Sequence, residues 1–90
     1  MTAEVRRTVR VAAGDGLHAR PCARIADLAR RSRSAVTVEH AGDVADARSI
    51  LEVLTLAVPG GCEVVVTAVG PDAESIADRI AAVITDPSSV

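Results

Sequence analysis

The chain has 90 residues, a formal net charge of −2 at pH 7, 49% hydrophobic residues and no Phe, Tyr or Trp. This length predicts a single domain over residues 1–90, and the lack of a basic excess and of aromatic rings argues against nucleic-acid binding. No apolar run reaches the ~18 residues of a membrane span and no signal peptide is recognisable, so we expect a cytoplasmic protein without membrane insertion.

The first predicted element is a β-strand within residues 4–13. Val5, Val9 and Val11 fall on one face of this strand, and mainly polar side chains fall on the other. Arg7 lies on the apolar face, which suits a position at or near the exposed end of a strand.

A helix is predicted after the break at "GDG". Apolar residues recur at helical spacing between Arg20 and Arg33, while charged residues occupy much of the other side. Pro21 has no backbone N–H to donate and is well tolerated only in the first turn of a helix, so the helix starts near Ala19 or Arg20. This start places His18 beside the amino end of the helix.

The middle of the chain predicts a hairpin and then a short helix. Residues 34–47 read as two short strands joined by a turn at residues 40–43. Ser49 and Glu52 form an S-x-x-E capping box, which predicts a helix beginning at Ser49. The Pro-Gly-Gly run at residues 59–61 then breaks that helix.

The remainder predicts a buried, β-branched strand in residues 62–69 and a last amphipathic helix with Asp72 as its cap. The apolar stripe of that helix comprises Ile76, Ala77, Ile80, Val83 and Ile84. Residues 85–90 read as a frayed tail. The resulting order, β-α-β-β-α-β-α, favours an α+β domain whose helices cover one face of a sheet.

The helix start around His18 combines the groups that phosphoryl transfer needs. Free N–H groups of the first turn, expected at Ala19, Arg20 and Cys22, carry the positive end of the helix dipole and bind phosphate readily. That end disfavours an imidazolium, so His18 stays neutral and nucleophilic, and Arg20 adds a charge-assisted contact. A histidine that accepts and passes on a phosphoryl group is a covalent catalyst. The plainer alternative is a solvent-facing histidine beside a solvated arginine.

Three segments carry a family resemblance that covers roughly residues 5–84: "GLHARP" with the amphipathic helix after it, "ARSILEVLTLAV", and "GCEVVVTAVGPDAESIADRIAAVI". They resemble the HPr family, the histidine-containing phosphocarriers of the bacterial phosphoenolpyruvate-dependent sugar phosphotransferase system. The resemblance implies an open-faced β-sandwich, with three helices on one face of a four-stranded antiparallel sheet. It calls for no cofactor.

The resemblance also implies a role for each site residue. His18 is the phosphorylated residue, modified at Nδ1, and Arg20 assists it. Phosphate comes from enzyme I and passes to the IIA component of sugar permeases, so the protein is a carrier, expected as a monomer, rather than a turnover enzyme. Partners dock around the first two helices, on a surface that comprises Arg20, Ala23, Arg24, Ile50, Leu51 and Leu54.

Several residues depart from the family's usual pattern, and no aromatic residue replaces the phenylalanine often found near the end of the first helix. The departures are Cys22, Arg48, Glu52 and Ala57, of which the last two lie near the docking surface. Cys22 is interpreted as a small buried hydrophobe rather than a redox-sensitive thiol. His18 and Cys22 are too few to hold a metal ion. His40 is interpreted as a solvated loop residue.

Ser49 corresponds to the serine that an HPr kinase phosphorylates in some members of the family. A phosphate there would interact favourably with the helix dipole and would add negative charge near the docking surface. The N-cap role alone also explains a serine at this position, with a contribution of about 1 kcal/mol. Both interpretations stay open on the sequence.

Other functions stay open as well. A carrier of a nitrogen-related or dihydroxyacetone-kinase branch would use the same histidine with different partners. A non-catalytic, anion-binding regulatory module would bind phosphate at His18 without accepting it. A metal-carrying βαββαβ protein is disfavoured by the absence of a C-x-x-C motif and by the extra terminal helix.

Overall fold

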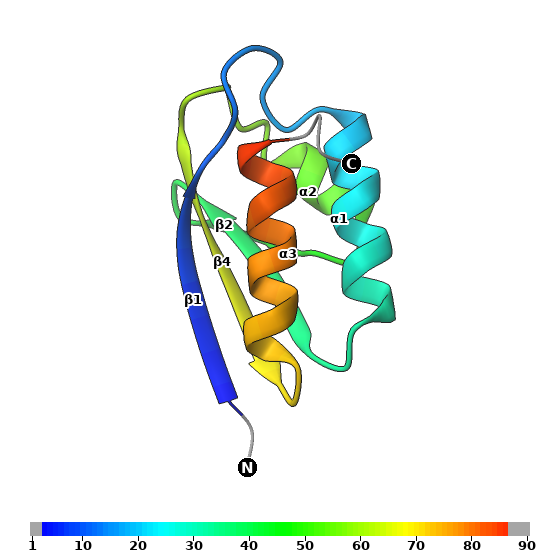
Figure 1. Ribbon diagram of the computed structural model, residues 1–90. Coiled ribbons are helices and arrows are strands. Elements are labelled where there is room, and N and C mark those ends of the chain that lie inside the picture. The colour runs from blue at the N-terminus through cyan, green and yellow to red at the C-terminus, as the bar shows by residue number, and fades with distance from the viewer. Residues whose placement is uncertain (1–2, 87–90) are drawn as a thin grey trace.

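The strands and helices follow the order that the sequence predicts. A computed structural model of the chain describes residues 3–86, and Figure 1 shows its helices packed on one face of its sheet. The elements are β1 (Ala3–Arg10), α1 (Ala19–Arg31), β2 (Ala35–His40), β3 (Asp43–Asp46), α2 (Ile50–Thr55), β4 (Glu63–Gly70) and α3 (Ala73–Thr85). The four strands form an antiparallel sheet in the order β1-β4-β2-β3. This arrangement confirms the predicted open-faced sandwich.

β1 is an edge strand, and it is half-buried as its alternation predicts. Val9 and the following Val11 are buried, and Val5 packs against the core. Arg7 lies in the middle of the strand rather than at an exposed end, and its Nε donates to the Asp78 carboxylate at 3.1 Å. Because α3 packs on β1, this ion pair gives the charge a partner on the covered face.

β4 lies between β1 and β2, and one of its two faces is buried. Val64, Val66 and Ala68 belong to the core, whereas Val69 on the opposite face is 37% exposed. The apolar run predicted a buried strand. Only every second residue of it is fully covered, because the helices lie on a single face of the sheet.

The core contains aliphatic side chains of modest size. The predicted apolar stripe of α3 is buried along its whole length, and so are the apolar positions predicted for α1. Ile25, Ile80 and Ile84 are among the largest side chains that are fully buried. Within residues 3–86, no helix combines the length and the apolar character needed to cross a membrane.

α1 and α2 both end earlier than the sequence predicts. α1 stops at Arg31, because Ser32 is extended and its hydroxyl donates to the Ala29 carbonyl at 2.8 Å. α2 stops at Thr55, before the Pro-Gly-Gly run, and Ala57 has a φ of +52°. That left-handed conformation ends a helix, and it is uncommon for a residue with a Cβ atom.

β2 and β3 form the predicted hairpin. Its two turn residues, Ala41 and Gly42, have φ values of +51° and +88°, a combination that suits the twist of the flanking strands. His40 is the last residue of β2 rather than a solvated loop residue. The residue is partly exposed, and its Nδ1 lies 3.3 Å from the Glu63 carbonyl oxygen, because the sheet brings the start of β4 close to the end of β2.

α3 begins at the predicted residue, but the cap differs from the expected one. Asp72 occupies the N-cap position, yet its carboxylate makes no hydrogen bond to the first turn of α3. It accepts hydrogen bonds from the Ser34 hydroxyl and the Arg33 backbone N–H instead, and these bonds lower the pKa of Asp72. α3 continues through Thr85, which the sequence assigned to a frayed tail, and residues 87–90 of that tail lie outside the described residues.

Candidate functional site

His18 is the N-cap residue of α1, with an extended backbone (φ −83°, ψ −175°). Its side chain is half-exposed and makes no capping hydrogen bond to the helix, and the first turn of α1 contains no acidic residue. The imidazole therefore stands at the positive end of the helix dipole, and no carboxylate of that turn offsets it. Sequence reasoning placed this helix start correctly, within one residue.

The loop before His18 is held against the segment that follows α2. The Leu17 N–H donates to the Val58 carbonyl at 3.0 Å, and the His18 N–H donates to the Gly16 carbonyl at 3.0 Å. Gly16 has a φ of +69°, and a Cβ atom there would collide with the Val58 carbonyl oxygen. The glycine of the "GLHARP" motif is therefore required by a close backbone approach, which the sequence alone did not reveal.

The backbone donors at the start of α1 differ from the expectation in one position. The Cys22 N–H donates to the His18 carbonyl at 3.2 Å, so it is not free as predicted. This is the first hydrogen bond of the helix, and the geometry of an α-helix requires it four residues after the N-cap. Pro21 has no N–H, so among residues 19–22 the unpaired backbone donors are those of Ala19 and Arg20.

Arg20 is exposed, and its guanidinium makes no hydrogen bond or ion pair within residues 3–86. Arg24, one turn further on, differs because it is half-buried and bound to Asp27 at 3.4 Å. A guanidinium without a carboxylate partner keeps its full capacity to bind an anion bidentately. Arg20 is therefore available to a phosphate at the helix start in a way that Arg24 is not.

Cys22 is fully buried beneath the helix start. Its Sγ lies 3.5 Å from the Leu17 carbonyl oxygen, and burial raises the pKa of the thiol. A raised pKa disfavours the reactive thiolate, which is the opposite of what the redox hypothesis required. The structure favours the other interpretation, a small hydrophobe in the core.

The residues predicted for partner docking are all at least partly accessible. Leu51 is 72% exposed and Leu54 is 37% exposed, while Val53 between them points into the core. Ala23 is exposed on α1, and Ile50 is half-buried at the start of α2. α1 and α2 pack against each other, so these residues belong to neighbouring helices.

Ser49 caps α2, although the capping box is only half formed. The Glu52 N–H donates to the Ser49 hydroxyl at 3.1 Å, as predicted. The Glu52 carboxylate does not return to the Ser49 N–H, because it accepts from the Asp46 N–H at 3.0 Å while Ser49 donates to the Asp46 carbonyl. Arg48, one of the departures from the family pattern, pairs with Asp46 at 2.9 Å.

Comparison with known proteins identifies the family to which this chain is related. Residues 5–86 match the family model described as "PTS HPr component phosphorylation site". The HPr-like protein Crh of Bacillus subtilis is 35% identical over 82 residues, which cover 91% of this chain and 96% of Crh. The phosphocarrier protein HPr of Haemophilus influenzae is 32% identical over 78 residues, which cover 87% of this chain and 92% of that protein.

Solved structures agree with the sequence matches. The crystal structure of HPr from Bacillus anthracis superimposes with a TM-score of 0.86 at 32% identity, covering 92% of this chain and 99% of that one. The solution structure of Crh from Bacillus subtilis superimposes with a TM-score of 0.69 at 35% identity. From the family match, the sequence identity and the shared fold, we conclude that this chain belongs to the HPr family of phosphotransferase-system phosphocarriers.

Proposed function

We propose that this protein is a single-domain, monomeric phosphocarrier of the cytoplasm that accepts a phosphoryl group on His18. The observation that carries the proposal is the open start of α1, where an uncapped histidine, two unpaired backbone N–H groups and an unpartnered guanidinium lie within three consecutive residues. Phosphoryl transfer asks a protein mainly for positioning and for stabilisation of negative charge. This helix start offers both.

The chemical step is a displacement at phosphorus. The Nδ1 lone pair of neutral His18 forms the new P–N bond while the bond between phosphorus and the donor breaks, and the donor leaves with that electron pair. The Ala19 and Arg20 N–H groups and the Arg20 guanidinium stabilise the charge on the phosphoryl oxygens. In the second transfer a nucleophile of the acceptor forms a new bond to phosphorus while the P–N bond breaks, and the electron pair of that bond returns to Nδ1 of His18.

Enzyme I is the proposed donor, and the IIA component of sugar permeases is the proposed acceptor. Both would contact the exposed side chains around the start of α1 and along α2, including Leu51 and Leu54. Exposed leucines on a small domain are typical of a surface that another protein covers. Carriers of the nitrogen-related or dihydroxyacetone-kinase branch would present the same histidine to other partners.

The test is phosphate transfer from labelled phosphoenolpyruvate through enzyme I, comparing the chain with its His18→Ala variant. We expect acid-labile, base-stable label on the unmodified chain and none on the variant, which is the signature of a phosphohistidine. The Arg20→Gln variant should still accept label, about 10–100-fold more slowly, because it loses one charge-assisted contact to the phosphoryl group.

The matched control for Arg20→Gln is Arg33→Gln, which removes the same charge from an exposed arginine far along the chain. It should transfer at the unmodified rate. If His18→Ala retains the label, the acceptor is another residue and the proposal fails. If the unmodified chain accepts no label while enzyme I phosphorylates a control HPr, the donors of the other branches become the next candidates, and failure with those would favour the anion-binding module.

A further inference from the structure

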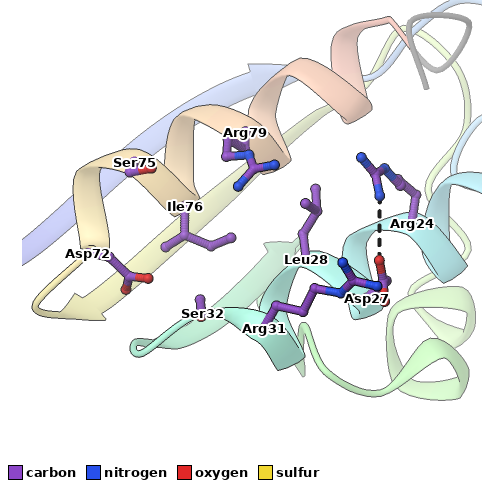
Figure 2. A pocket seen from close by; sticks show the side chains of 9 residues that line it. All are labelled: Arg24, Asp27, Leu28, Arg31, Ser32, Asp72, Ser75, Ile76 and Arg79. Atoms are coloured by element: carbon purple, nitrogen blue, oxygen red, sulfur yellow. Dashed lines mark hydrogen bonds and ion pairs between the residues drawn. The ribbon is translucent and has the colours of Figure 1, made fainter.

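A second polar site lies between α1 and α3, away from His18. There residues 24–31 of α1 and the first half of α3 border a hollow of about 190 Å³. Figure 2 shows three guanidinium groups around it, those of Arg24 and Arg31 from α1 and that of Arg79 from α3. The hydroxyls of Ser32 and Ser75 also line this hollow, which we call the α1–α3 hollow.

The charges of the α1–α3 hollow do not balance. Asp27 is shared by two arginines, with Arg24 at 3.4 Å and Arg31 at 3.2 Å. The other lining carboxylate, Asp72, accepts from the Ser34 hydroxyl and the Arg33 N–H rather than from an arginine side chain. Arg79 has no hydrogen bond or ion pair within residues 3–86, so positive charge remains uncompensated in the hollow.

One buried donor in the α1–α3 hollow lacks an acceptor. The Nε atom of Arg24 is inaccessible and has no hydrogen-bond partner among the described residues. Buried N–H groups almost always have a hydrogen-bond partner, because a buried donor without an acceptor is destabilising. The unpaired Nε–H group of Arg24 therefore needs an explanation. The Arg24 side chain lines the hollow, so a small turn of its guanidinium toward an oxygen atom bound there would supply the missing acceptor.

The floor of the hollow is apolar and belongs to the core. Leu28 is 5% exposed and Ile76 is 4% exposed, and Figure 2 shows the Leu28 side chain between the guanidiniums of Arg24 and Arg79. Both residues belong to the core, so the two helices that carry the arginines are packed against the rest of the protein at the hollow.

We propose that the α1–α3 hollow binds a small phosphate-bearing anion. Guanidinium groups bind phosphate and carboxylate oxygens bidentately. Guanidinium donors from two helices, together with the Ser75 hydroxyl, suit a tetrahedral phosphate better than a planar carboxylate. The volume lies below the ~300–1,000 Å³ of sites for drug-sized ligands, so the ligand is inorganic phosphate or a small phosphate ester.

This site is separate from the phosphoryl acceptor. Leu28, in the floor of the hollow, follows His18 by ten positions, a distance of about 15 Å at the rise of an α-helix, and Arg24 is the lining residue of α1 nearest to His18 in the sequence. The proposal therefore does not rest on the proposed function, and either can fail without the other. A chain that accepts phosphate on His18 would carry a distinct, non-covalent phosphate site between α1 and α3.

The experiment is a titration of the ¹⁵N-labelled chain with inorganic phosphate at constant ionic strength, followed by backbone and arginine Nε–Hε signals. We expect saturable shifts at Ser32, Ser75 and Arg79. The Arg79→Gln variant should bind about tenfold more weakly, as expected for the loss of one charge-assisted contact. Arg33→Gln is the matched control, because it removes an equal charge from the same end of the helix pair without touching the hollow. It should bind as the unmodified chain does.

Two further arms identify the ligand. Acetate at the same concentrations should leave the three signals unshifted, and glycerol phosphate binding more tightly than inorganic phosphate would identify a phosphate ester. Equal weakening by Arg79→Gln and Arg33→Gln would mean non-specific attraction and would overturn the proposal, as would linear shifts or equal shifts with acetate. Signals of residues 17–20, read in the same spectra, report separately on the His18 site.

Discussion

The starts of α1 and α2 are two opposite solutions to the same problem, the unpaired N–H groups of a first helical turn. α2 is capped from within, because the Ser49 hydroxyl accepts from the Glu52 N–H and Glu52 places a carboxylate in the first turn. α1 has neither feature, since the His18 side chain makes no capping bond and the first turn contains no acidic residue. Each helix start carries the positive end of its own helix dipole, but only the start of α2 has a side-chain cap and a carboxylate to interact with it.

This difference shows which helix start serves stability and which is left open to a ligand. A serine, threonine, aspartate or asparagine at the N-cap contributes about 1 kcal/mol relative to alanine, and α1 does without it. In return, the Ala19 and Arg20 N–H groups and the positive end of the dipole stay available to an anion. The start of α3 is intermediate, because Asp72 occupies the cap position but directs its carboxylate to Ser34 and Arg33.

The largest effect is expected when the start of α1 is converted into one like that of α2. His18→Ser places a good cap on a backbone that already has cap geometry, so it should stabilise the fold by about 0.5–1 kcal/mol. The same variant should lose phosphoryl acceptance completely. Urea unfolding and labelled transfer measure the two effects, with His18→Ala as the control that loses transfer without gaining a cap. A variant no more stable than His18→Ala would show that α1 needs no cap.

Next in size is the loop that delivers His18. Gly16→Ala introduces a Cβ that collides with the Val58 carbonyl, and we expect a loss of about 3 kcal/mol from overpacking together with backbone strain. Gly14→Ala is the matched control, since its φ is also positive but nothing lies within 4 Å of the added Cβ. Its loss should stay within about 1–2 kcal/mol. Equal losses in urea unfolding would mean that the contact with Val58 is unimportant.

A smaller effect is expected from opening the start of α2. Ser49→Ala removes the bond from the Glu52 N–H and should cost about 1 kcal/mol in urea unfolding, while label transfer to His18 continues. Ser49→Asp should recover most of that stability, because aspartate also caps well. Mass spectrometry of the native protein under several carbon sources would then show whether Ser49 is also a phosphorylation site. A failure of Ser49→Asp to recover stability would contradict the cap interpretation.

The smallest effect concerns the start of α3 and pH. The bonds from Ser34 and Arg33 lower the pKa of Asp72 below its ordinary 3.8, so the carboxylate favours the folded state when ionised. This contribution is present above the unfolded pKa and is lost as pH falls through the folded pKa, in the region below about pH 4. Asp72→Asn should therefore be less stable at pH 7 and should lose less stability on acidification. The measurement is the free energy of unfolding of both proteins at pH 7 and below about pH 4. An equal loss of stability on acidification in the two proteins would refute this.

Local chemistry allowed much of the fold to be predicted from the sequence. The position of Pro21 set the start of α1, helical spacing identified the buried stripe of α3, and the pairing of Ser49 with Glu52 located α2. Each of these signals acts within a few residues along the chain, where propensity, capping and periodicity operate. The role of His18 itself stays a prediction until transfer is measured.

Partners far apart in the sequence decided the rest. Asp72 turns to Ser34, 38 residues away, and Arg7 meets Asp78, 71 residues away, although the sequence predicted a cap and an exposed strand end. Gly16 is needed because Val58 passes close to it, and the α1–α3 hollow exists only where two helices from opposite ends of the chain converge. A sequence pattern shows which groups need partners, and tertiary packing determines which partners come within reach.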